Sequence, residues 1–385
     1  MNNFEFQTVP HLISHTGAAK QLGKTIALHY PTVKHVLLVT DAGFLKTGLV
    51  QPAIDDIKAT DRNVSVFSDV VADPSEAVVL QAVAQAREQR VDLVVGFGGG
   101  SSMDVAKLIA VLAGSEQELS TMYGIGNVKG QRLPLIQIPT TAGTGSEVTP
   151  ISIVTTGATT KMGVVAPQLY ADIAILDAEL TLGLPAAVSA ATGIDAMVHA
   201  IEAYTTKHKK NPLSDMLARQ ALQLLWNNIR TVCHEPKNMA ARQAMLLGAL
   251  LAGQSFANAP CAAVHALAYP IGGIFHVPHG LSNSLVLPPV LRFNAPVAHH
   301  QYAELADIIA PNEHGSSHAK SAALINALEH LAEELGIATR LHQVGISSND
   351  LDRLATDAML QTRLLGNNPR EIDWQHARHI YAEVL

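Results

Sequence analysis

The sequence is poor in cysteine, in charge and in long apolar runs, and each shortage excludes a class of protein. Two cysteines, Cys233 and Cys261, in 385 residues give no disulfide framework and fit a reducing compartment. Charged residues make up 15% of the chain and hydrophobic residues 48%, which excludes a disordered protein. No apolar run approaches the roughly 18 residues that span a bilayer. The first residues show neither the basic nor the apolar region of a secretory signal.

Basic clusters are also missing, and the net charge is −7. Nucleic acid and anionic membranes are therefore not expected as partners. These shortages together predict a cytoplasmic globular protein, and they permit an enzyme without naming one.

The chain length and a change in hydrophobic pattern along the chain predict two domains. A chain of 385 residues is too long for one ordinary hydrophobic core. Through residue 183, short apolar runs alternate with helical patterns, which is typical of a parallel sheet covered on both faces. From 184 to 385, apolar residues recur at helical spacing. We expect a Rossmann-like α/β domain (1–183) and an all-helical domain (184–385), with a cleft between them. The predicted strands cover 36–41, 64–70, 93–100 and 133–141, with shorter ones, including a hairpin, at 151–156, 162–166 and 173–179.

A glycine-rich turn joins the run 93–100 to the helical pattern that follows it. Such a turn offers backbone N–H groups and a positive helix end to a pyrophosphate, with no Cβ in the way. The G-x-G-x-x-G fingerprint is incomplete, since Ser101 replaces its third glycine. A tight turn without a ligand explains this feature equally well. The residues concerned are Gly98, Gly99, Gly100, Ser101 and Ser102.

Two further segments favour a dinucleotide. The segment 140–147 leaves the next strand with small and hydroxyl residues that suit a ribose or phosphate. Asp41 ends the strand 36–41, where its carboxylate would accept from ribose hydroxyls and repel a 2′-phosphate, which favours NAD over NADP. The simpler interpretation of Asp41 is a helix cap.

The helical half carries a candidate metal site. Asp195 and His199 are four residues apart in an apolar helical pattern, so both side chains lie on one face. A buried carboxylate needs a partner, and a plain Asp–His pair would satisfy that need. The segment 264–280 adds three histidines among apolar residues. Asp with neutral imidazoles suits Zn²⁺ or Fe²⁺, but spacing does not decide which of His265, His276 and His279 binds.

Four segments resemble, in order and spacing, the signatures of the iron-containing (group III) alcohol dehydrogenases. They are GGGSSMDVAK (98–107), IPTTAGTGSEVT (138–149), GIDAMVHAIEAY (193–204) and HALAYPIGGIFHVPHG (265–280). The resemblance implies an NAD(H)-linked interconversion of a small alcohol with its aldehyde or ketone, in which the metal polarises the substrate oxygen. It also implies a dehydroquinate synthase-like architecture and a homodimer.

The resemblance further implies roles for single residues. It makes Asp195, His199, His265 and His279 the metal ligands, with Fe²⁺ preferred and Zn²⁺ or Ni²⁺ as options. Tyr269 stands where many members carry another histidine, so Tyr269 and His276 become candidates for a proton relay or a supporting role. Asp73 replaces a frequent Asn beside the adenosine ribose. The implied cofactor contacts are Asp41, Gly98, Gly99, Gly100, Ser101, Ser102, Thr140, Thr141, Thr144, Lys161 and Leu182.

Two other activities would use the same architecture. A hydroxyacid–oxoacid transhydrogenase with retained NAD would use the same residues. A dehydroquinate synthase-like lyase would need Lys and Arg to hold a phosphorylated substrate, and the segments 193–204 and 264–280 contain neither.

Overall fold

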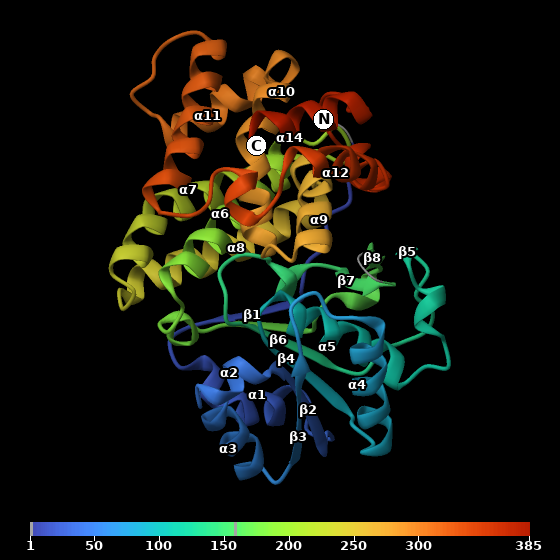
Figure 1. The fold of residues 1–385 in the computed structure, drawn as a ribbon. Coiled ribbons are helices and arrows are strands. Elements are labelled where there is room, and N and C mark those ends of the chain that lie inside the picture. The colour runs from blue at the N-terminus through green and yellow to red at the C-terminus, as the bar shows by residue number, and fades with distance from the viewer. Residues whose placement is uncertain (1–2, 158–159) are drawn as a thin grey trace. The chain divides into compact units, whose positions relative to one another are not determined.

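A computed structural model describes residues 3–157 and 160–385. The described chain forms two compact units. One comprises Thr8–Thr141 and Gly145–Gly183, and the other comprises Leu184–Leu385, Ala142–Thr144 and the described residues up to Gln7. The first unit is α/β and the second is helical, which confirms the predicted fold class (Figure 1).

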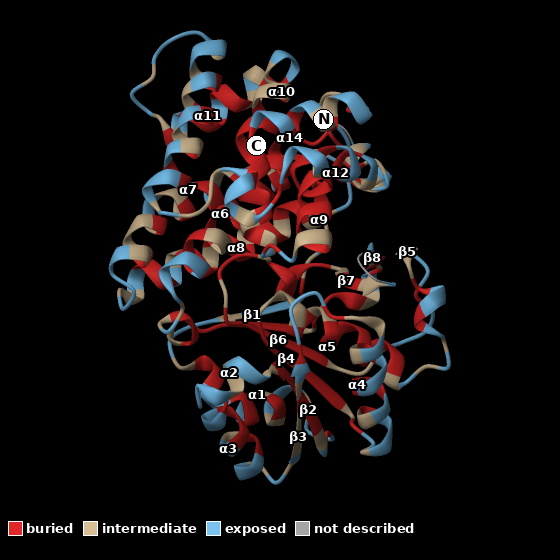
Figure 2. Ribbon diagram, in the orientation of Figure 1, coloured by how far each residue is buried: buried red, intermediate tan, exposed pale blue. Residues whose placement is uncertain are grey.

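The α/β unit contains a six-stranded sheet with the strand order β1-β9-β6-β4-β2-β3. Every neighbouring pair in this sheet is parallel. The central β4 is buried along its whole length, as a near-continuous apolar run predicts (Figure 2). The strands are β1 (His11–Ser14), β2 (His35–Asp41), β3 (Asn63–Val70), β4 (Leu93–Gly98), β6 (Leu135–Pro139) and β9 (Ile173–Leu176).

The later, shorter runs form the predicted hairpin and one further strand of the main sheet. β7 (Ile151–Thr156) pairs antiparallel with β8 (Thr160–Val165). With β5 (Gly124–Ile125) they make a separate three-stranded sheet, whereas β9 joins the main sheet beside β6 and β1.

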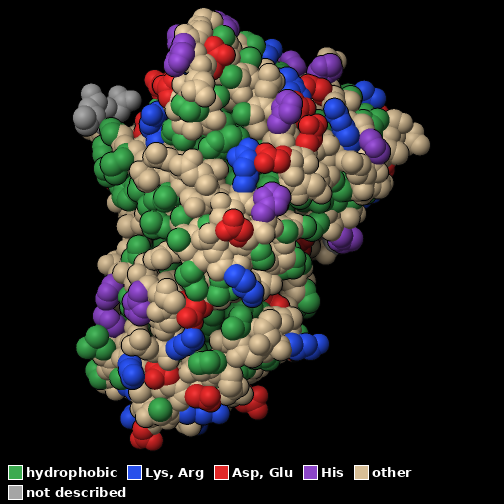
Figure 3. Space-filling model, turned by 90° about the vertical axis from the view of Figure 1, so that its left-hand side faces the viewer, with side chains coloured by type: hydrophobic (Ala, Val, Ile, Leu, Met, Phe, Trp, Pro, Cys, Tyr) green, Lys and Arg blue, Asp and Glu red, His purple; other side chains and the backbone are tan. Residues whose placement is uncertain are grey.

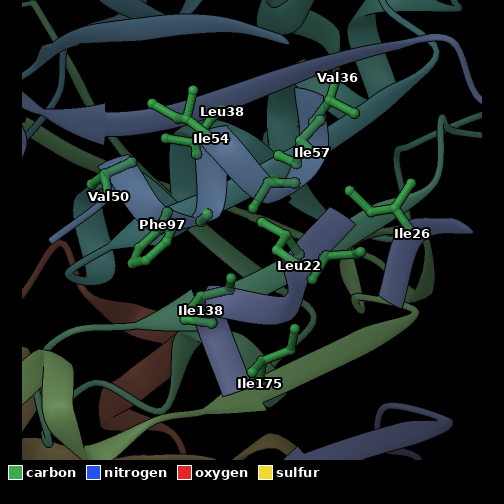
Figure 4. Close-up of a cluster of buried hydrophobic side chains, with 14 of the residues drawn as sticks. Leu22, Ile26, Val36, Leu38, Val50, Ile54, Ile57, Phe97, Ile138 and Ile175 are labelled. Carbon is green, nitrogen blue, oxygen red and sulfur yellow. The ribbon is translucent and has the colours of Figure 1, made fainter. Parts of the chain in front are cut away.

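Helices cover both faces of the main sheet. On one face, α1 (Leu22–His29) and α3 (Gln51–Ala59) bury their apolar sides against alternate residues of the strands (Figure 4). The shared core includes Leu22, Ile57, Leu38, Phe97 and Ile138. On the other face lie α4 (Glu76–Glu88) and α5 (Gly100–Ala113).

Close packing of α5 depends on Gly96 of β4. A Cβ at this position would lie 2.9 Å from the Cβ of Ala106 and would also collide with the side chain of Gln137. The missing side chain therefore lets α5 approach the sheet. The short α2 (Ala42–Lys46) follows β2 directly.

The helical unit contains no strand among its described residues. Several of its helices begin at side-chain caps, for example Asn211, whose amide oxygen accepts from the N–H of Ser214. No helix in the described part of the chain is long and apolar enough to cross a membrane. The helices are α6 (Ala186–Thr205), α7 (Pro212–His234), α8 (Met239–Asn258), α9 (Ala263–Phe275), α10 (His279–Ile309), α11 (Ser317–Glu334), α12 (Leu351–Ala358), α13 (Thr362–Leu365) and α14 (Trp374–Glu383).

Two short pieces of the expected α/β domain belong instead to the helical unit. The backbone of Gln7 exchanges two hydrogen bonds with the side chain of Asn258 on α8, at 2.7 and 2.8 Å. Gly143 packs so closely on Thr192 of α6 that a Cβ would lie 2.8 Å from the Thr192 Cβ. Both attachments join residues far apart in sequence, and hydrophobic periodicity carries no sign of them.

Candidate active site

Helix α6 carries three ionisable side chains on one buried face. Asp195, His199 and Glu202 follow one another at four and three residues, the spacing that aligns side chains along a helix. They are 1%, 4% and 3% exposed. Buried charges require partners, and these partners come from α9 and α10.

His265 lies on α9, and His279 is the first residue of α10. Between the two helices, His276 ends α9 in the left-handed conformation with φ 56°, and Pro278 precedes α10. This tight connection brings both imidazoles back to Asp195. The structure thus places ligand atoms of Asp195, His265 and His279 within 4.8 Å of one another.

Three of these ligand atoms converge on one hydrogen-bond donor. The amide Nδ2 of Asn283, one turn after His279, lies 2.6 Å from Asp195 Oδ1. The same nitrogen lies 3.3 Å from His265 Nε2 and 3.3 Å from His279 Nε2. This N–H₂ group is surrounded by one carboxylate oxygen and two imidazole nitrogens, which is an environment that also suits a bound cation.

His199 lies beside this cluster, but it belongs to a second group of possible ligands, with Cys261 and His265, and not to the group of Asp195, His265 and His279. Its ring stacks on His265 with centroids 4.7 Å apart and on Phe256 with centroids 4.3 Å apart. Asn283 Oδ1 is buried without a hydrogen-bond partner among the described residues. Buried polar atoms without partners are uncommon and often mark a missing ion or water. The residues present therefore fit a divalent metal with nitrogen and oxygen ligands.

Burial and mutual charge shift the pKa values of the cluster. Burial acts to raise the pKa of Asp195, but His199, His279 and His265 outweigh it and hold that pKa below its usual range. Burial lowers the pKa of His199 to about 3, against the opposing charge of Asp195. Hence Asp195 is ionised and His199 neutral at physiological pH, which are the forms that bind a metal.

The pKa of His265 moves the other way. Burial acts to lower it, but Cys261 and Glu202 raise it well above the ordinary value. The carboxylate Oε2 of Glu202 accepts from Nδ1 of His265 at 2.6 Å. Cys261 forms a second group of possible ligands with His199 and His265, again within 4.8 Å.

The two relay candidates lie in different surroundings. The ring of Tyr269 packs against His279, with centroids 5.9 Å apart. His276 is exposed and does not join either group of possible metal ligands among the described residues. The structure therefore brings Tyr269 to the cluster and leaves His276 outside it.

The cofactor candidates of the α/β unit gather at the carboxyl ends of β2, β4 and β6. Gly99 is the N-cap residue of α5 and has no side chain that could cap the first N–H groups of this helix. A Cβ on Gly99 would meet nothing closer than Thr141, at 3.8 Å. The open space beside uncapped N–H groups suits a phosphate. Gly98, Gly100, Ser101, Ser102 and Thr140 lie in or beside this turn.

Asp41 lies at the same edge of the sheet. Its Oδ1 accepts from the N–H of Phe44 at 2.8 Å and so caps α2. Its Oδ2 lies 3.8 Å from where a Cβ of Gly98 would stand. Asp41 is thus a helix cap whose second oxygen faces the glycine turn.

The remaining candidates are more scattered. Lys161 on β8 forms an ion pair with Asp73, a residue with φ 54°. Leu182 follows the 3-10 turn Ala178–Thr181. Thr144 belongs to the helical unit, whereas Thr140 and Thr141 belong to the α/β unit.

The sequence reasoning missed four residues of these sites. Glu202 lies seven residues after Asp195 and Asn283 four after His279, so helical spacing could have revealed both. Cys261 was considered only in the cysteine count that excluded a disulfide framework, and not as a possible metal ligand. Lys107 is fully buried and donates to Ser146 Oγ at 2.7 Å and to the Ile151 carbonyl at 2.6 Å, anchoring the segment that follows the turn 140–145.

Comparisons with known proteins agree with these observations. A family model described as iron-containing alcohol dehydrogenase matches residues 10–178. A second, described as Fe-containing alcohol dehydrogenase family, C-terminal, matches residues 189–385. Long-chain-alcohol dehydrogenase 1 of Geobacillus thermodenitrificans (strain NG80-2) is 40% identical over 352 residues, covering 90% of this chain and 89% of the relative.

Solved structures have the same fold. A crystal structure of 1,3-propanediol oxidoreductase matches with a TM-score of 0.95 and 32% identity over 100% of both chains. Sulfoacetaldehyde reductase from Bifidobacterium kashiwanohense, in complex with NAD⁺, matches with a TM-score of 0.88 and 28% identity over 100% of this chain and 99% of that one.

Fold and relatives define an oxidoreductase of the alcohol dehydrogenase class. The chain belongs to the iron-containing alcohol dehydrogenase family. The alcohol dehydrogenase interpretation is thereby supported over both the transhydrogenase and the lyase.

Proposed function

We propose that this enzyme interconverts a small alcohol and its aldehyde or ketone with NAD(H), using one divalent metal, Fe²⁺ in the first place. Asp195, His199, His265 and His279 hold the metal. The observation that carries the proposal is the convergence of Asp195, His265 and His279 on the Asn283 amide. When bound, the metal supplies Lewis acidity toward the substrate oxygen.

The chain's own residues prepare this chemistry. Asp195 contributes one negative charge, so the site holds a divalent cation without fully neutralising it. Phe256 stacks on His199 and forms an apolar wall, which limits water at the cluster. Tyr269, packed on His279, is the better placed of the two relay candidates and carries a hydroxyl that can pass a proton.

The cofactor assignment is supported by charge. The free oxygen of Asp41 faces the glycine turn, where it would accept from a ribose hydroxyl and repel a 2′-phosphate. A related reductase of 28% identity is known in complex with NAD⁺. The nicotinamide supplies the hydride chemistry, while the protein supplies orientation and electrostatics.

The substrate is proposed to be uncharged. The segments that carry the metal ligands, 193–204 and 264–280, contain no Lys or Arg. A phosphate or sulfonate would find no counter-charge on them. Aromatic side chains such as Phe256 and Tyr269 beside the cluster favour a partly apolar alcohol.

The test is a panel of alcohols and aldehydes of increasing chain length, with sulfoacetaldehyde as a charged comparison. It uses NAD(H) and NADP(H) on metal-free enzyme reloaded with Fe²⁺, Zn²⁺ or Ni²⁺. We expect NADH formation only with metal, a preference for NAD and uncharged substrates, and loss of turnover in the H265A/H279A double variant. Full turnover after exhaustive chelation, or in that variant, would overturn the metal's role. Turnover without added NAD, by NAD that co-purifies, would identify a transhydrogenase instead.

A further inference from the structure

Glu202 has no place in the reaction described so far, although it is among the most buried carboxylates of the helical unit. It is 3% exposed and forms no ion pair with a Lys or Arg of the described residues. Its carboxylate accepts from the N–H of Ala262 at 3.0 Å and from the N–H of Val264 at 2.7 Å. The third donor is Nδ1 of His265, at 2.6 Å. An unpaired buried carboxylate is costly, and these three donors offset the cost of burying Glu202.

The three donors are arranged around the start of α9. Ala262 is the N-cap position of α9, and Val264 and His265 lie in its first turn. Glu202 therefore fixes the position of this turn on α6 and the orientation of the His265 ring at the same time. The negative charge also suits the positive end of a helix.

The ring of His265 presents one nitrogen to a carboxylate and the other to an amide. Nδ1 faces Glu202, and Nε2 faces the Asn283 amide that Asp195 also contacts. An imidazole that donates its Nδ1 proton to a carboxylate keeps the Nε2 lone pair free for a metal. With the other tautomer, Nε2 would carry the proton and could not bind a metal.

We propose that Glu202 is a positioning residue that fixes His265 in the tautomer and orientation in which Nε2 binds the metal. This inference rests on the metal site proposed above and deepens it. Glu202 acts through its contacts with His265 and with the first turn of α9.

The same contact separates two possible ligand groups. His265 belongs to one group with Asp195 and His279 and to another with His199 and Cys261. By accepting a hydrogen bond from Nδ1–H, Glu202 keeps the proton on Nδ1 and leaves Nε2, which lies beside the Asn283 amide, for the group that contains Asp195.

The test is metal affinity rather than activity. Glutamine at position 202 has the shape of glutamate but only one acceptor oxygen for three donors. Its N–H₂ group must face either Val264 or the pair formed by Ala262 and His265. We expect E202Q to raise the Kd for Zn²⁺ or Co²⁺, measured by competition with a chelator at one pH, by about 10–100-fold.

Asp177 offers a matched control. It is fully buried and accepts from three backbone N–H groups, those of Gly17, Ala19 and Glu179, but it contacts no proposed ligand. D177N should lower the melting temperature because it loses buried hydrogen bonds, as E202Q also does. It should leave the metal Kd unchanged within about twofold, because Asp177 accepts only from backbone N–H groups away from the proposed ligands. Equal Kd values for E202Q, D177N and wild type would overturn the inference.

A double-mutant cycle separates this inference from the proposed metal site. If His265 binds the metal, H265A raises the Kd, and adding E202Q to H265A raises it no further. If H265A binds metal as tightly as wild type does, the proposed site itself is wrong. If H265A weakens binding but E202Q does not, only the role of Glu202 is wrong.

A measurement on the wild type covers the case in which E202Q does not fold. In Zn²⁺-loaded protein with ¹⁵N-labelled histidine, the proton of His265 should lie on Nδ1. A His265 ring protonated at Nε2 would overturn the proposal.

Discussion

At the scale of single residues, Glu147 shows how burial sets a charge state. Glu147 is 2% exposed, and burial raises the pKa of its carboxyl to about 7, although Lys107 acts to lower it. In the unfolded chain a glutamate titrates near 4.3. Folding therefore favours the protonated form of this side chain.

The sign of the pH effect follows from that difference. Because the folded state holds the proton more tightly, the contribution of Glu147 to stability is complete below about pH 4 and is lost as pH rises toward 7. The loss amounts to at most about 4 kcal/mol. We predict that E147Q removes this part of the pH dependence, so the variant gains stability relative to wild type between pH 5 and pH 8. The free energy of unfolding of both proteins, measured with denaturant at several pH values, tests this prediction.

Glu88 is the control for this prediction, because it is exposed at the end of α4. E88Q should follow the wild-type curve over the same pH range. If E147Q also follows that curve, the carboxyl of Glu147 is not held protonated by the fold.

At the scale of helices, the ligand cluster depends on how closely α10 packs on α6. Gly280, the residue after His279, has no room for a side chain. A Cβ there would lie 2.8 Å from the carbonyl carbon of Ala191 and 3.3 Å from the Cβ of Asp195. Since the nearest atoms belong to the backbone of α6, they cannot move aside.

We predict that G280A separates α10 from α6 and therefore His279 from Asp195. Overpacking of this kind costs about 1–3 kcal/mol, and metal affinity should fall with it. Melting temperature and chelator competition measure the two effects. G272A on α9 is the control, because its nearest atom would be 3.4 Å away. A G280A variant that binds metal like G272A would contradict this account of the packing.

Helical spacing explains how much of the cluster was predictable. Asp195 and His199 could be paired from the sequence because both lie on one helix. His265 and His279 lie on two other helices, so periodicity could not bring them to Asp195. Only the resemblance to a known family singled them out from His276. The left-handed turn at His276 that directs α10 back toward α6 had no readable signal.

The strands of the sheet could be predicted more fully than the tertiary contacts of the segments that follow them. Continuous apolar runs predicted the strands, because a strand buried on both faces needs no polar side. The segment 142–144 was assigned to the α/β domain, yet it belongs to the helical unit. This segment packs on the helical unit because Gly143 has no side chain to collide with Thr192. That is a tertiary contact, and hydrophobic periodicity does not reveal it.

At the scale of the whole molecule, the two units divide the candidate machinery. The α/β unit carries the uncapped glycine turn with Asp41, and the helical unit carries the Asp–His cluster. A dehydrogenase needs both halves, because the cofactor takes the hydride while the metal acts on the substrate oxygen. Family membership over residues 10–178 and 189–385 agrees with that division. The expected homodimer and cytoplasmic location stay predictions.

The central claim is that one divalent metal binds to Asp195, His199, His265 and His279. X-ray diffraction of Fe²⁺-loaded crystals, with data collected on both sides of the iron absorption edge, tests it most directly. We expect one anomalous peak per chain within bonding distance of these four side chains, with the Asn283 amide turned away from it. A peak bound by Cys261, or none at this cluster in active enzyme, would contradict it.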